Sequence, residues 1–377
     1  MSNDVGHFVS NYLPITETFI YQYLTNHERY EPFVCGTFSE NVDLFEFSPR
    51  EIFMELPRWN PRFWTYGALA KLGVKDIRDT YYPRVLERRD PDIMHAHFGP
   101  MGVDLAPYQR DNRKLVTSFY GYDASRFVQQ EADAREQYQT LFDQGDLVLV
   151  EGPAMAEKVE ELGCPRSKIG IQRIAINTSR ITPQYPDVDG GIRVLMVGRF
   201  VQKKGMPDGI KAFANAFKRN DAELRIVGGP GTYKQKQLQK IARDANIEDS
   251  VTFTGFLEYD DYLREVHECD LLLAPSKLAD SGDSEGGAPT VLLEAQASGK
   301  PVVSTTHADI PYVVEDGETG ILVEPGDVTA LSEALTSCTA DPEKMEEMGR
   351  AGVKRMAERH DIGVLAPKLE QRYDELR

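Results

Sequence analysis

The second half of the chain alternates between short β-rich runs and longer segments in which apolar residues recur with helical spacing. This alternation restricts the fold more than any other feature of the sequence. The runs with strand character are Ile192–Val197, Leu224–Val227, Val251–Phe253, Leu271–Ala274 and Pro301–Ser304. The helical segments between them are Pro207–Lys218, Lys234–Ala245, Tyr259–Glu268 and Pro289–Ser298. Strands that alternate with helices build βαβ units, so we predict a parallel sheet covered by helices on both faces.

The first half alternates less regularly, and its most strand-like runs are Ile93–Gly99, Lys114–Phe119 and Asp146–Val150. Thr182–Gly191 is rich in Pro, Gly and Asp, which is typical of an interdomain linker. The chain has 377 residues, whereas a single hydrophobic core stops growing at roughly 250–300 residues. We therefore predict an α/β protein with two doubly wound domains, residues 1–181 and 192–360, that face each other across a cleft. Ligands of such sheets bind outside the carboxyl ends of the strands.

The chain is strongly acidic, with a formal net charge of −17. This charge argues against nucleic acid as a partner, because nonspecific binding there depends on phosphate neutralisation by Lys and Arg. The four cysteines are widely scattered, which favours reduced thiols over a zinc site or a disulfide framework. We find neither a signal peptide nor an apolar run long enough to span a bilayer, so we predict a cytoplasmic protein.

Two glycine turns follow predicted strands in the second half. Gly198 opens the segment GRFVQKKG, in which Arg199 and Lys204 could converge on a diphosphate. A surface loop with solvated cations is the alternative. Gly228 and Gly229 end the next strand and could bring main-chain N–H groups close to an anion or a base.

The segment Asp280–Glu294 is the most informative part of the sequence. Pro289 stands where a first-turn helical proline belongs, and the glycines before it leave backbone N–H groups exposed at the helix N-terminus. The helix dipole makes this end a ready anion site. Glu285 lies in the loop beside that site. Glu294 follows an apolar run inside a buried helix, so its carboxylate needs a partner, either a ribose diol or a buried salt bridge.

Together these segments resemble the GT-B glycosyltransferases of family 4. The resemblance covers nearly the whole chain. It is carried by GRFVQKKG at Gly198, the turn at Gly228, EGGAPTVLLEAQASGKPVVST at Glu285–Thr305 and DGETGILVEPGD at Asp316–Asp327. In the first half, YLPITETFI, HAHFG and FYGYD resemble the branch that acts in exopolysaccharide and glycolipid assembly. The resemblance implies two Rossmann-like domains and a C-terminal helix, residues 361–377, that returns to the N-terminal domain.

The resemblance also implies an activity. It indicates a metal-independent, retaining transferase that moves a hexose from a nucleotide-sugar donor to a glycan or lipid-linked acceptor without a cofactor. Arg199 and Lys204 would hold the donor diphosphate. Glu285 would bind donor-sugar hydroxyls near the anomeric carbon, and Glu294 would accept hydrogen bonds from the ribose. The implied donor-binding residues are Gly198, Gly228, Gly229, Gly286, Gly287, Ala288, Pro289, Thr290 and Glu294.

The chain departs from the family pattern in three places. Glu285 and Glu294 lie one residue further apart than usual, and Asp309 enters a wall that glycines usually line. Tyr120 stands where many relatives carry a His that reaches the donor sugar or phosphate. A phenol with a reference pKa near ~10 is a poor acid or base at neutral pH. This last departure leaves a second reading open, a catalytically silent nucleotide-sugar-binding subunit of a partner glycosyltransferase. A nucleotide-sugar epimerase on the same fold is disfavoured by the Glu285–Glu294 region.

Several residues of the first half are candidates for the acceptor side. Tyr12, Glu17 and Thr18 lie in the first predicted loop, although Glu17 could instead cap the following helix. The other candidates are His97 and Asp123. His95 and His97 form H-x-H on a predicted strand, which places both on one face, but a metal site would need a third ligand, so we predict a cleft-lining or core role.

The segment Phe53–Arg89 concentrates aromatic and basic residues, including both tryptophans, Trp59 and Trp64. Such a segment could rest on an anionic membrane surface and meet a lipid-linked acceptor. A peripheral contact at the inner face of the membrane would follow. The alternative is that the aromatic rings pack in the N-terminal core and the cations are ordinary surface residues.

Overall fold

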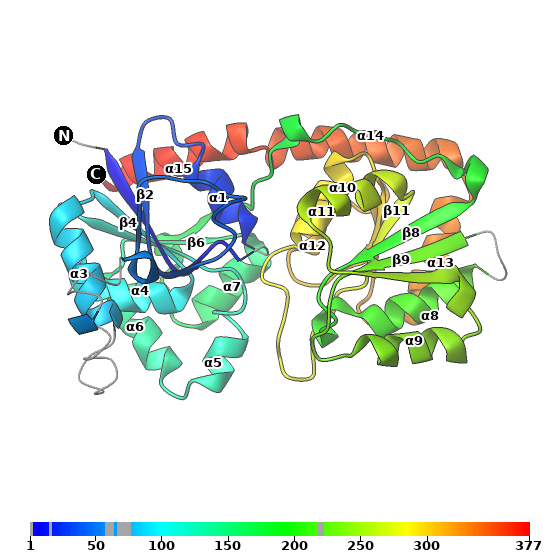
Figure 1. Ribbon diagram of the computed structural model, residues 1–377, viewed down its shortest axis with the longest axis horizontal. Helices are drawn as coiled ribbons and strands as arrows, with labels where there is room; N and C mark the ends of the chain where they lie inside the picture. Colours follow the sequence, from blue (N-terminus) through cyan, green and yellow to red (C-terminus); the bar gives the residue numbers. More distant parts are fainter. Residues whose placement is uncertain (1–2, 15–16, 57–63, 66–76, 218–221) are drawn as a thin grey trace. The chain divides into compact units, whose positions relative to one another are not determined.

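The structure, a computed structural model, describes residues 3–14, 17–56, 64–65, 77–217 and 222–377. It consists of two compact units: unit 1 comprises Met1–Ala175 and Ile362–Arg377, and unit 2 comprises Ile176–Asp361. Figure 1 shows that each unit is built around its own sheet with helices packed on it. Every pairing between neighbouring strands of the two sheets is parallel, as the alternation of strands and helices predicts.

The sheet of unit 1 has the strand order β3-β2-β1-β4-β5-β6-β7. The chain winds outward from β1 in one direction and from β4 in the other, so the topological switch point lies between β1 and β4. The strands are β1 (Asp4–Tyr12), β2 (Glu31–Ser39), β3 (Arg50–Ile52), β4 (Ile93–His97), β5 (Lys114–Ser118), β6 (Leu147–Val150) and β7 (Ile169–Ile171).

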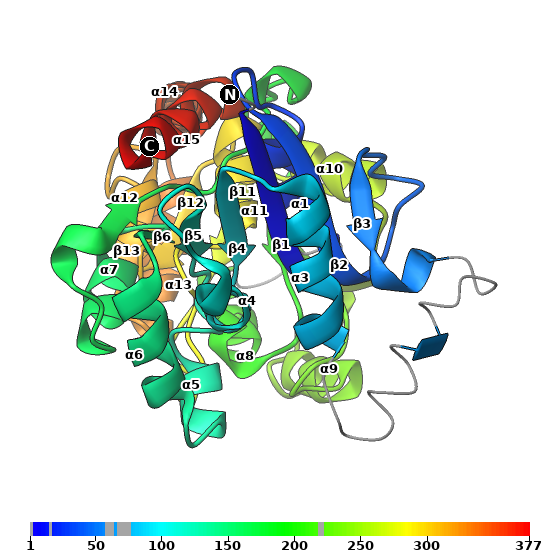
Figure 2. The same ribbon diagram turned by 90° about the vertical axis from the view of Figure 1, so that its left-hand side faces the viewer.

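Helices cover both faces of this sheet, and alternate strand residues enter two separate cores. Figure 2, which faces unit 1, shows α3 and α4 lying over its strands. Met94 packs in the core under α3, α4, α6 and α7, whereas its neighbour Ile93 packs with α1 and α15 on the opposite face. The helices are α1 (Thr18–Leu24), α3 (Ile77–Arg89), α4 (Gly99–Leu105), α5 (Arg126–Gln130), α6 (Ala134–Gln144), α7 (Pro153–Glu161) and α15 (Ile362–Leu376).

The C-terminal helix α15 is thus part of unit 1, although it is the last element of the chain. Leu365, Leu369 and Tyr373 are buried in the same core as Ile93 and Leu149.

The sheet of unit 2 has the strand order β10-β9-β8-β11-β12-β13, with its switch point between β8 and β11. In Figure 1, α8 and α9 lie on one side of these strands and α10 and α11 on the other. The strands are β8 (Ile192–Val197), β9 (Ala222–Val227), β10 (Val251–Gly255), β11 (Leu271–Ala274), β12 (Val302–Thr305) and β13 (Gly320–Val323). The helices are α8 (Met206–Ala216), α9 (Gln235–Asp244), α10 (Tyr259–Glu268), α11 (Thr290–Ala297), α12 (Ile310–Val313), α13 (Val328–Thr339) and α14 (Pro342–Arg359).

The segment predicted as the interdomain linker, Thr182–Gly191, lies within unit 2, because unit 2 begins at Ile176. Its backbone is fixed there. The amide of Gln184 donates to the carbonyl of Ser298 (2.9 Å), and the amide of Asp187 donates to Asp270 (3.1 Å). The composition of the segment reflects a route over the surface of one unit rather than a free connection.

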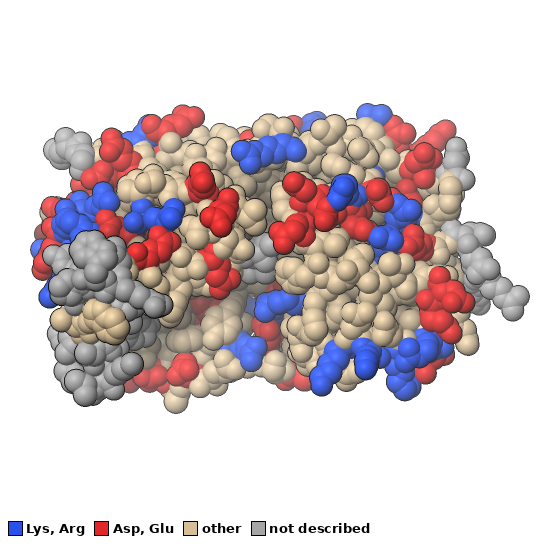
Figure 3. Space-filling model, viewed as in Figure 1, with Lys and Arg blue, Asp and Glu red and all other residues tan. Residues whose placement is uncertain are grey.

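The surface charge and the aromatic segment Phe53–Arg89 are the features on which the predictions about nucleic acid and membrane partners depend. Figure 3 shows acidic and basic side chains interspersed over the face in view. Much of Phe53–Arg89 lies outside the described residues, including Trp59, so the membrane contact stays a prediction. Within the described part, Tyr81 and Tyr82 are buried in the core while Trp64 is exposed. None of the described helices combines the length and apolar character needed to cross a bilayer.

Candidate functional site

In unit 2 the two predicted glycine turns meet at the carboxyl ends of β8 and β9. Gly198 and Gly228 have φ angles of 148° and 145°, a region that side-chain-bearing residues rarely adopt. A Cβ atom on Gly228 would lie 2.0 Å from the carbonyl oxygen of Gly198. The turns can therefore touch only because residue 228 is a glycine. This contact keeps the two turns close together at the carboxyl ends of the strands, the edge of the sheet where ligands of such folds bind.

Lys204 and Glu285 form an ion pair at the switch point of unit 2. The Nζ atom of Lys204 lies 2.9 Å from Oε1 of Glu285, and the hydroxyl of Ser276 donates to the same oxygen at 3.0 Å. Burial alone would raise the pKa of Glu285, but the nearby ammonium groups of Lys204 and Lys203 outweigh it and lower that pKa. Glu285 is thus a carboxylate with a fixed orientation.

A glycine brings this lysine loop against the end of β11. Gly205 has a φ angle of 61°, and a Cβ atom there would lie 1.9 Å from the carbonyl oxygen of Pro275. Gly205 lies between Lys204 and the first residue of α8. Close approach of the two backbones is what allows Lys204 to reach Glu285.

The loop that carries Glu285 is held from two sides. Lys203 Nζ contacts Asp283 (3.0 Å) and the carbonyl of Ser284 (2.8 Å). On the other side, the Ser284 hydroxyl lies 3.0 Å from Nε2 of His307, which follows β12. The sequence analysis did not single out Lys203, Ser276 or His307. Only Lys203 lies in a segment, GRFVQKKG, that could have pointed to it.

Arg199 is not joined to this cluster. Its side chain is exposed, and no hydrogen bond or ion pair of that side chain occurs among the described residues. Asp309, the other polar candidate near the loop, is buried and precedes α12. The structure therefore brings Lys204 and Glu285 together and leaves the guanidinium of Arg199 accessible to a ligand.

Helix α11 begins at Thr290, directly after Pro289, with no side-chain cap. Gly286, Gly287 and Ala288 lead into this first turn, and Gly287 is buried. An uncapped helix N-terminus presents N–H groups and the positive end of the helix dipole. At the predicted anion site, a glycine-containing segment thus leads into a helix N-terminus that no side chain caps.

Glu294 has two tyrosine partners and no salt bridge among the described residues. Tyr262 donates to its Oε2 atom at 2.6 Å, and Tyr259 donates to Oε1 at 3.3 Å. Burial raises the pKa of Glu294, and the two tyrosine hydrogen bonds oppose that increase. Both tyrosines lie three residues apart on α10, a spacing that places them on one face. Each carboxylate oxygen keeps capacity to accept a further hydrogen bond.

In unit 1 three histidines meet at the switch point between β1 and β4. His7 on β1 is paired in register with His95 on β4, and His97 follows on the same face. All three are buried. His7 Nδ1 lies 2.9 Å from His97 Nε2, and His95 is bonded to Ser118 (2.8 Å) and Tyr373 (2.6 Å). His7 is the third residue that the H-x-H pattern alone could not supply.

These imidazoles are close enough to share a metal ion, but their nitrogens are already in use. The ligand atoms of His7, His95 and His97 lie within 4.8 Å of one another. However, both ring nitrogens of each of the three take part in a hydrogen bond. Burial lowers the pKa of all three, with their mutual proximity adding to the effect. We read the cluster as a neutral hydrogen-bonded core.

Tyr120 extends this cluster to a small pocket. Its hydroxyl lies 2.7 Å from His97 Nδ1, and its ring contacts Phe19 at 4.7 Å between centroids. The pocket has a volume of about 10 Å³, room for about one water molecule. It is lined at the carboxyl ends of β4 to β7 by His97, Ser118, Tyr120, Glu151, Gln172 and Arg173, with Phe19 and Tyr23 from α1.

Asp123 has a structural role. It is fully buried, and its carboxylate accepts hydrogen bonds from the amides of Gly99 (2.9 Å), Tyr120 (3.0 Å) and Gly121 (2.9 Å). Burial raises its pKa to about 6, although these amides oppose the shift. The predicted acceptor-side Asp123 therefore fixes the turn that carries Tyr120 and the start of α4.

The remaining acceptor-side candidates do not line this pocket. Tyr12 is buried, and its hydroxyl donates to the carbonyl of Phe45 at 3.4 Å. Thr18 is the first residue of α1, and Glu17 precedes it without a side-chain capping bond. Burial, with Glu40 nearby, raises the pKa of Glu17 to about 7. Of the five candidates, the structure places only His97 at the pocket, together with Phe19, which the sequence analysis did not name.

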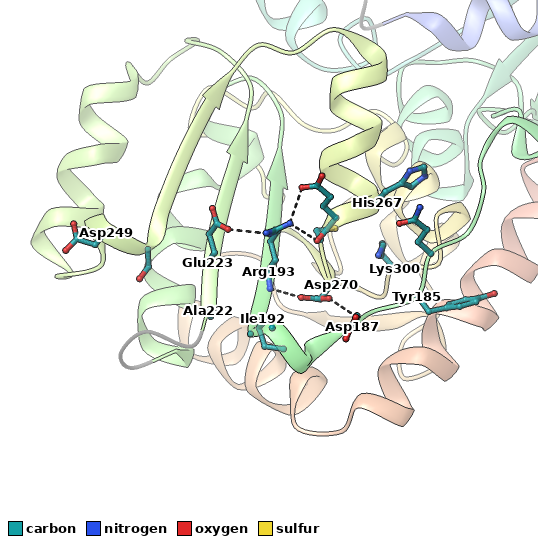
Figure 4. A pocket seen from close by; sticks show the side chains of 16 residues that line it. Tyr185, Asp187, Ile192, Arg193, Ala222, Glu223, Asp249, His267, Asp270 and Lys300 are labelled. Atoms are coloured by element: carbon teal, nitrogen blue, oxygen red, sulfur yellow. Dashed lines mark hydrogen bonds and ion pairs between the residues drawn. The ribbon is translucent and has the colours of Figure 1, made fainter.

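A much larger depression, of about 1070 Å³, lies at the opposite edge of the unit 2 sheet. Figure 4 shows Arg193 at its centre, bonded to Glu223 and Glu268, while its backbone amide donates to Asp270. These residues stand at the amino ends of their strands. Parallel sheets of this kind bind ligands at the carboxyl ends, so we do not place the donor in this depression despite its size.

Comparisons with known proteins agree with this geometry. The family model "Glycosyl transferases group 1" matches residues 178–355. The chain is 34% identical over 253 residues to a putative colanic acid biosynthesis glycosyltransferase, WcaL, of Escherichia coli K12, an alignment that covers 65% of this chain and 61% of WcaL. It is 34% identical over 249 residues to the amylovoran biosynthesis glycosyltransferase AmsK of Erwinia amylovora, with 65% and 60% covered. The chain thus matches about three fifths of the length of these relatives.

A solved structure extends the likeness to the whole chain. HepE of Anabaena, in complex with UDP and glucose, superimposes with a TM-score of 0.78 at 18% sequence identity, and the superposition covers 99% of both chains. At this identity the likeness concerns the fold. The fold is GT-B, as the resemblance in the sequence implied.

Proposed function

We propose that this chain is a retaining hexosyltransferase that uses a nucleotide-sugar donor and a glycan or lipid-linked acceptor. The match of residues 178–355 to the group 1 glycosyltransferase model supports this proposal. The observation that carries the proposal is the Lys204–Glu285 ion pair at the switch point of unit 2. A cation and an oriented carboxylate stand there at the carboxyl ends of β8 and β11, in the same unit as the open N-terminus of α11. This set suits a diphosphate joined to a sugar.

Binding of the donor would redistribute these contacts. Lys204 and the exposed guanidinium of Arg199 would take the diphosphate oxygens, helped by the amides of Gly287, Ala288 and Thr290. Pro289 has no N–H to offer. Glu285, released from Lys204 in part but still held by Ser276, would accept hydrogen bonds from sugar hydroxyls. Glu294, oriented by its two tyrosines, would accept from the ribose hydroxyls.

The chemistry would then depend on charge placement. Departure of the nucleoside diphosphate leaves positive charge on the sugar and negative charge on the phosphate. Fixed cations at the phosphate stabilise that separation, and positioning of the reactants provides the rest of the rate enhancement. Lys204, Arg199 and the dipole of α11 supply the positive charge. We therefore propose that this step needs no metal ion.

The relatives narrow the substrates that we propose. WcaL and AmsK are named for the assembly of colanic acid and amylovoran, and HepE was solved with UDP and glucose. We accordingly propose a hexose donor activated by a nucleoside diphosphate and a growing polysaccharide unit as acceptor.

Calorimetry of the purified chain against UDP-, GDP- and ADP-hexoses, with and without EDTA, tests the donor. We expect one nucleotide class to bind with unchanged affinity in EDTA, and Lys204→Ala to weaken that binding at least tenfold, while Lys211→Ala, an exposed lysine of α8, leaves it unchanged. Absence of binding to all three classes would contradict the proposal.

Turnover decides between an enzyme and a silent subunit. We expect the purified chain alone to release nucleoside diphosphate from the donor that binds. Transfer to an acceptor should keep the anomeric configuration, which NMR of the product can establish. Tight donor binding without any turnover, alone or with acceptor, would favour a binding subunit instead.

A further inference from the structure

A continuous line of hydrogen bonds runs through unit 1 from the pocket to the C-terminal helix. The hydroxyl of Tyr120 lies 2.7 Å from His97 Nδ1, and His97 Nε2 lies 2.9 Å from His7 Nδ1. His7 Nε2 lies 3.0 Å from His27 Nε2, and His27 Nδ1 lies 3.2 Å from Glu370 Oε1. The line joins residues that are far apart in the sequence and uses both ring nitrogens of all three histidines.

One end of this line has a fixed hydrogen-bond direction. Oε1 of Glu370 accepts from the backbone amides of Glu28 (2.8 Å) and Arg29 (2.9 Å) as well as facing His27. Burial would raise the pKa of Glu370, but the His27 hydrogen bond and these amides outweigh it and lower the pKa to about 2. Glu370 is therefore ionised and can only accept. His27 must place a proton on Nδ1.

The direction then passes along the line by elimination. A neutral imidazole carries one N–H donor and one acceptor nitrogen. With its proton on Nδ1, His27 accepts at Nε2, so His7 donates from Nε2 and accepts at Nδ1. His97 in turn donates from Nε2 and accepts at Nδ1. The partner left for that acceptor is the hydroxyl of Tyr120, which must donate its proton to His97.

Neutral histidines are favoured by what surrounds them. Burial lowers the pKa of His7 and His97 well below the ordinary value. The charge of Glu370 is already balanced by Arg29, whose Nε lies 3.2 Å from Oε2. Glu370 thus has a cationic partner other than His27. The other titratable groups around His27 are His95 of β4, Tyr373 of α15 and Tyr30. The ring centroids of Tyr373 and Tyr30 lie 6.0 and 6.5 Å from that of His27.

We propose that Glu370, His27, His7 and His97 form a one-way relay, a line in which every hydrogen bond points from Tyr120 towards Glu370. Because Tyr120 then donates its proton to His97, its oxygen is a hydrogen-bond acceptor for a substrate hydroxyl in the adjacent pocket. The substrate class is the hydroxyl-bearing acceptor, so this part rests on the proposed transferase function. Tyr120 is the residue that touches the hydroxyl. His97, His7, His27 and Glu370 act through it as positioning residues.

The size of the pocket and the protonation state of Tyr120 agree with such a role. Its volume of about 10 Å³ admits a single hydroxyl group rather than a whole sugar. Burial raises the pKa of Tyr120 well above its ordinary value, although a hydrogen bond with the Ser118 side chain opposes the shift, so the phenol keeps its proton. The Tyr120 side chain thus replaces the usual His at this position by a hydroxyl that has an imidazole behind it.

Nitrogen NMR of the wild-type protein tests the direction without any assay of activity. Long-range proton–nitrogen correlation of protein labelled at histidine distinguishes the two neutral tautomers. We expect the proton on Nε2 in His7 and His97 and on Nδ1 in His27. A proton on Nδ1 of His97 would overturn the relay. Loss of these signals on titration with Zn²⁺, with binding at or below micromolar concentration, would also overturn it in favour of a metal site.

Paired variants at Glu370 test what the relay is for. Glu370→Gln keeps an oxygen at Oε1, because only an oxygen can accept the Glu28 and Arg29 amides, and so keeps the direction while removing the charge. Glu370→Leu removes the acceptor. We expect Glu370→Leu and Tyr120→Phe to raise KM for the acceptor at least tenfold with the donor KM within twofold, and Glu370→Gln to stay within twofold for both.

The two proposals fail in different ways. Equal loss in Glu370→Gln and Glu370→Leu would mean that the charge matters and would overturn the relay, as would an unchanged acceptor KM in Tyr120→Phe. Should Glu370→Leu not fold, the wild-type tautomers and Tyr120→Phe still decide. A chain that binds no nucleotide sugar refutes the transferase, whereas the histidine tautomers are read independently of it.

Discussion

Lys204 has an anionic partner within the protein itself. The sequence analysis left open a surface loop with solvated cations, but the side chain of Lys204 is only 18% exposed and is held by Glu285. A phosphate that approaches must therefore compete with a carboxylate for the ammonium group. The same contact preorganises the lysine, so little side-chain entropy remains to be lost on binding.

Replacing Lys204 therefore affects both activity and stability. We expect Lys204→Ala to reduce turnover by about 10²–10³-fold, the range found when one charge-stabilising donor is removed. It should also lower the free energy of unfolding by roughly 1–3 kcal/mol, because a buried carboxylate loses its cation. The measurements are kcat and a urea titration.

A double variant separates the two effects. Lys204→Ala combined with Glu285→Gln removes the unpaired charge and should recover most of the stability without recovering the activity. Lys211→Ala, on the exposed face of α8, serves as the charge-matched control. Full activity in Lys204→Ala would remove the proposed diphosphate site.

The buried histidines predict a dependence of stability on pH. Burial lowers the pKa of His7, His95 and His97 in the folded state below the unfolded value near ~6.5. The unfolded chain then binds more protons, so stability is full above about pH 6.5 and falls as the pH drops below it. Each histidine contributes up to about 1.4 kcal/mol per pH unit, or about 4 kcal/mol for the three.

Hydrogen exchange followed separately in the two units measures this effect. Between pH 7.5 and 5.5, after correction for intrinsic exchange, β1 and β4 should lose protection more than β8 and β11. Glu370 does not interfere, because its lowered pKa of about 2 places its own contribution between the unfolded carboxyl pKa near ~4.5 and pH 2. Glu17 and Asp123 oppose the histidines, because their pKa values are raised to about 7 and about 6 and they gain protons in the folded state as the pH falls, so the loss in unit 1 is smaller than the histidines alone would give. An equal loss in both units would refute the assignment to the histidine cluster.

Strands and helices of unit 2 follow from local sequence, whereas those of unit 1 follow only in part. β8 and β11 have the predicted bounds because they are short apolar runs between turns. β1 was not predicted, since DVGHFVSNY places His7 and other polar residues in a buried strand. His7 belongs to the histidine cluster, whereas Ser10 is exposed and Asn11 donates to Glu40. No local pattern announces a partner such as Glu370, which lies 343 residues from His27.

The predicted chemistry shows the same division. The sequence analysis singled out Lys204, Glu285 and the start of α11 because each lies in a turn next to a strand or helix end. Asp123 was named as an acceptor-side candidate for the same reason: its position in a turn looks accessible, but three amides donate to its carboxylate. Only the folded chain shows which polar residue of a turn faces inward.

A comparison of two glycines separates the effect of a close contact between two backbone segments from the effect of a left-handed backbone conformation. Gly205 and Gly317 have similar positive φ angles, 61° and 76°, but a Cβ atom at Gly317 meets nothing within 4 Å, whereas at Gly205 it meets Pro275. Gly317→Ala should cost about 1–2 kcal/mol, the price of a left-handed residue. Gly205→Ala should cost about 2–5 kcal/mol, since overpacking adds to that strain.

Thermal unfolding gives the stability of both variants, and donor affinity gives the consequence for the site. Gly205→Ala should weaken donor binding because the loop with Lys204 must move away from β11. Gly317→Ala should bind the donor normally. Equal stability of the two variants would mean that the contact with Pro275 yields without cost.

At the scale of the whole molecule, the chain order and the division into units do not coincide. Unit 1 is completed by the last 16 residues, Ile362–Arg377, after the chain has built all of unit 2. α15 supplies Leu365, Leu369 and Tyr373 to the core of unit 1 and Glu370 to the histidine relay. Unit 1 therefore depends on a segment that is synthesised after unit 2.

Deletion of residues 362–377 should for this reason damage unit 1 and spare unit 2. Ile362, Leu365, Ala366, Leu369 and Tyr373 are all buried in the unit 1 core. At roughly 1.5–3 kcal/mol for each large apolar side chain, their loss approaches the whole stability of a typical domain, about 5–15 kcal/mol. Unit 2 keeps its own core, with Val194, Leu224 and Leu273 among its buried residues. Hydrogen exchange should show β1 and β4 unprotected and β8 and β11 protected, and calorimetry should show donor affinity within threefold of the full chain. Exposed β8 and β11 in the shortened chain would mean that unit 2 cannot stand without unit 1, and that the donor site is not the property of one unit.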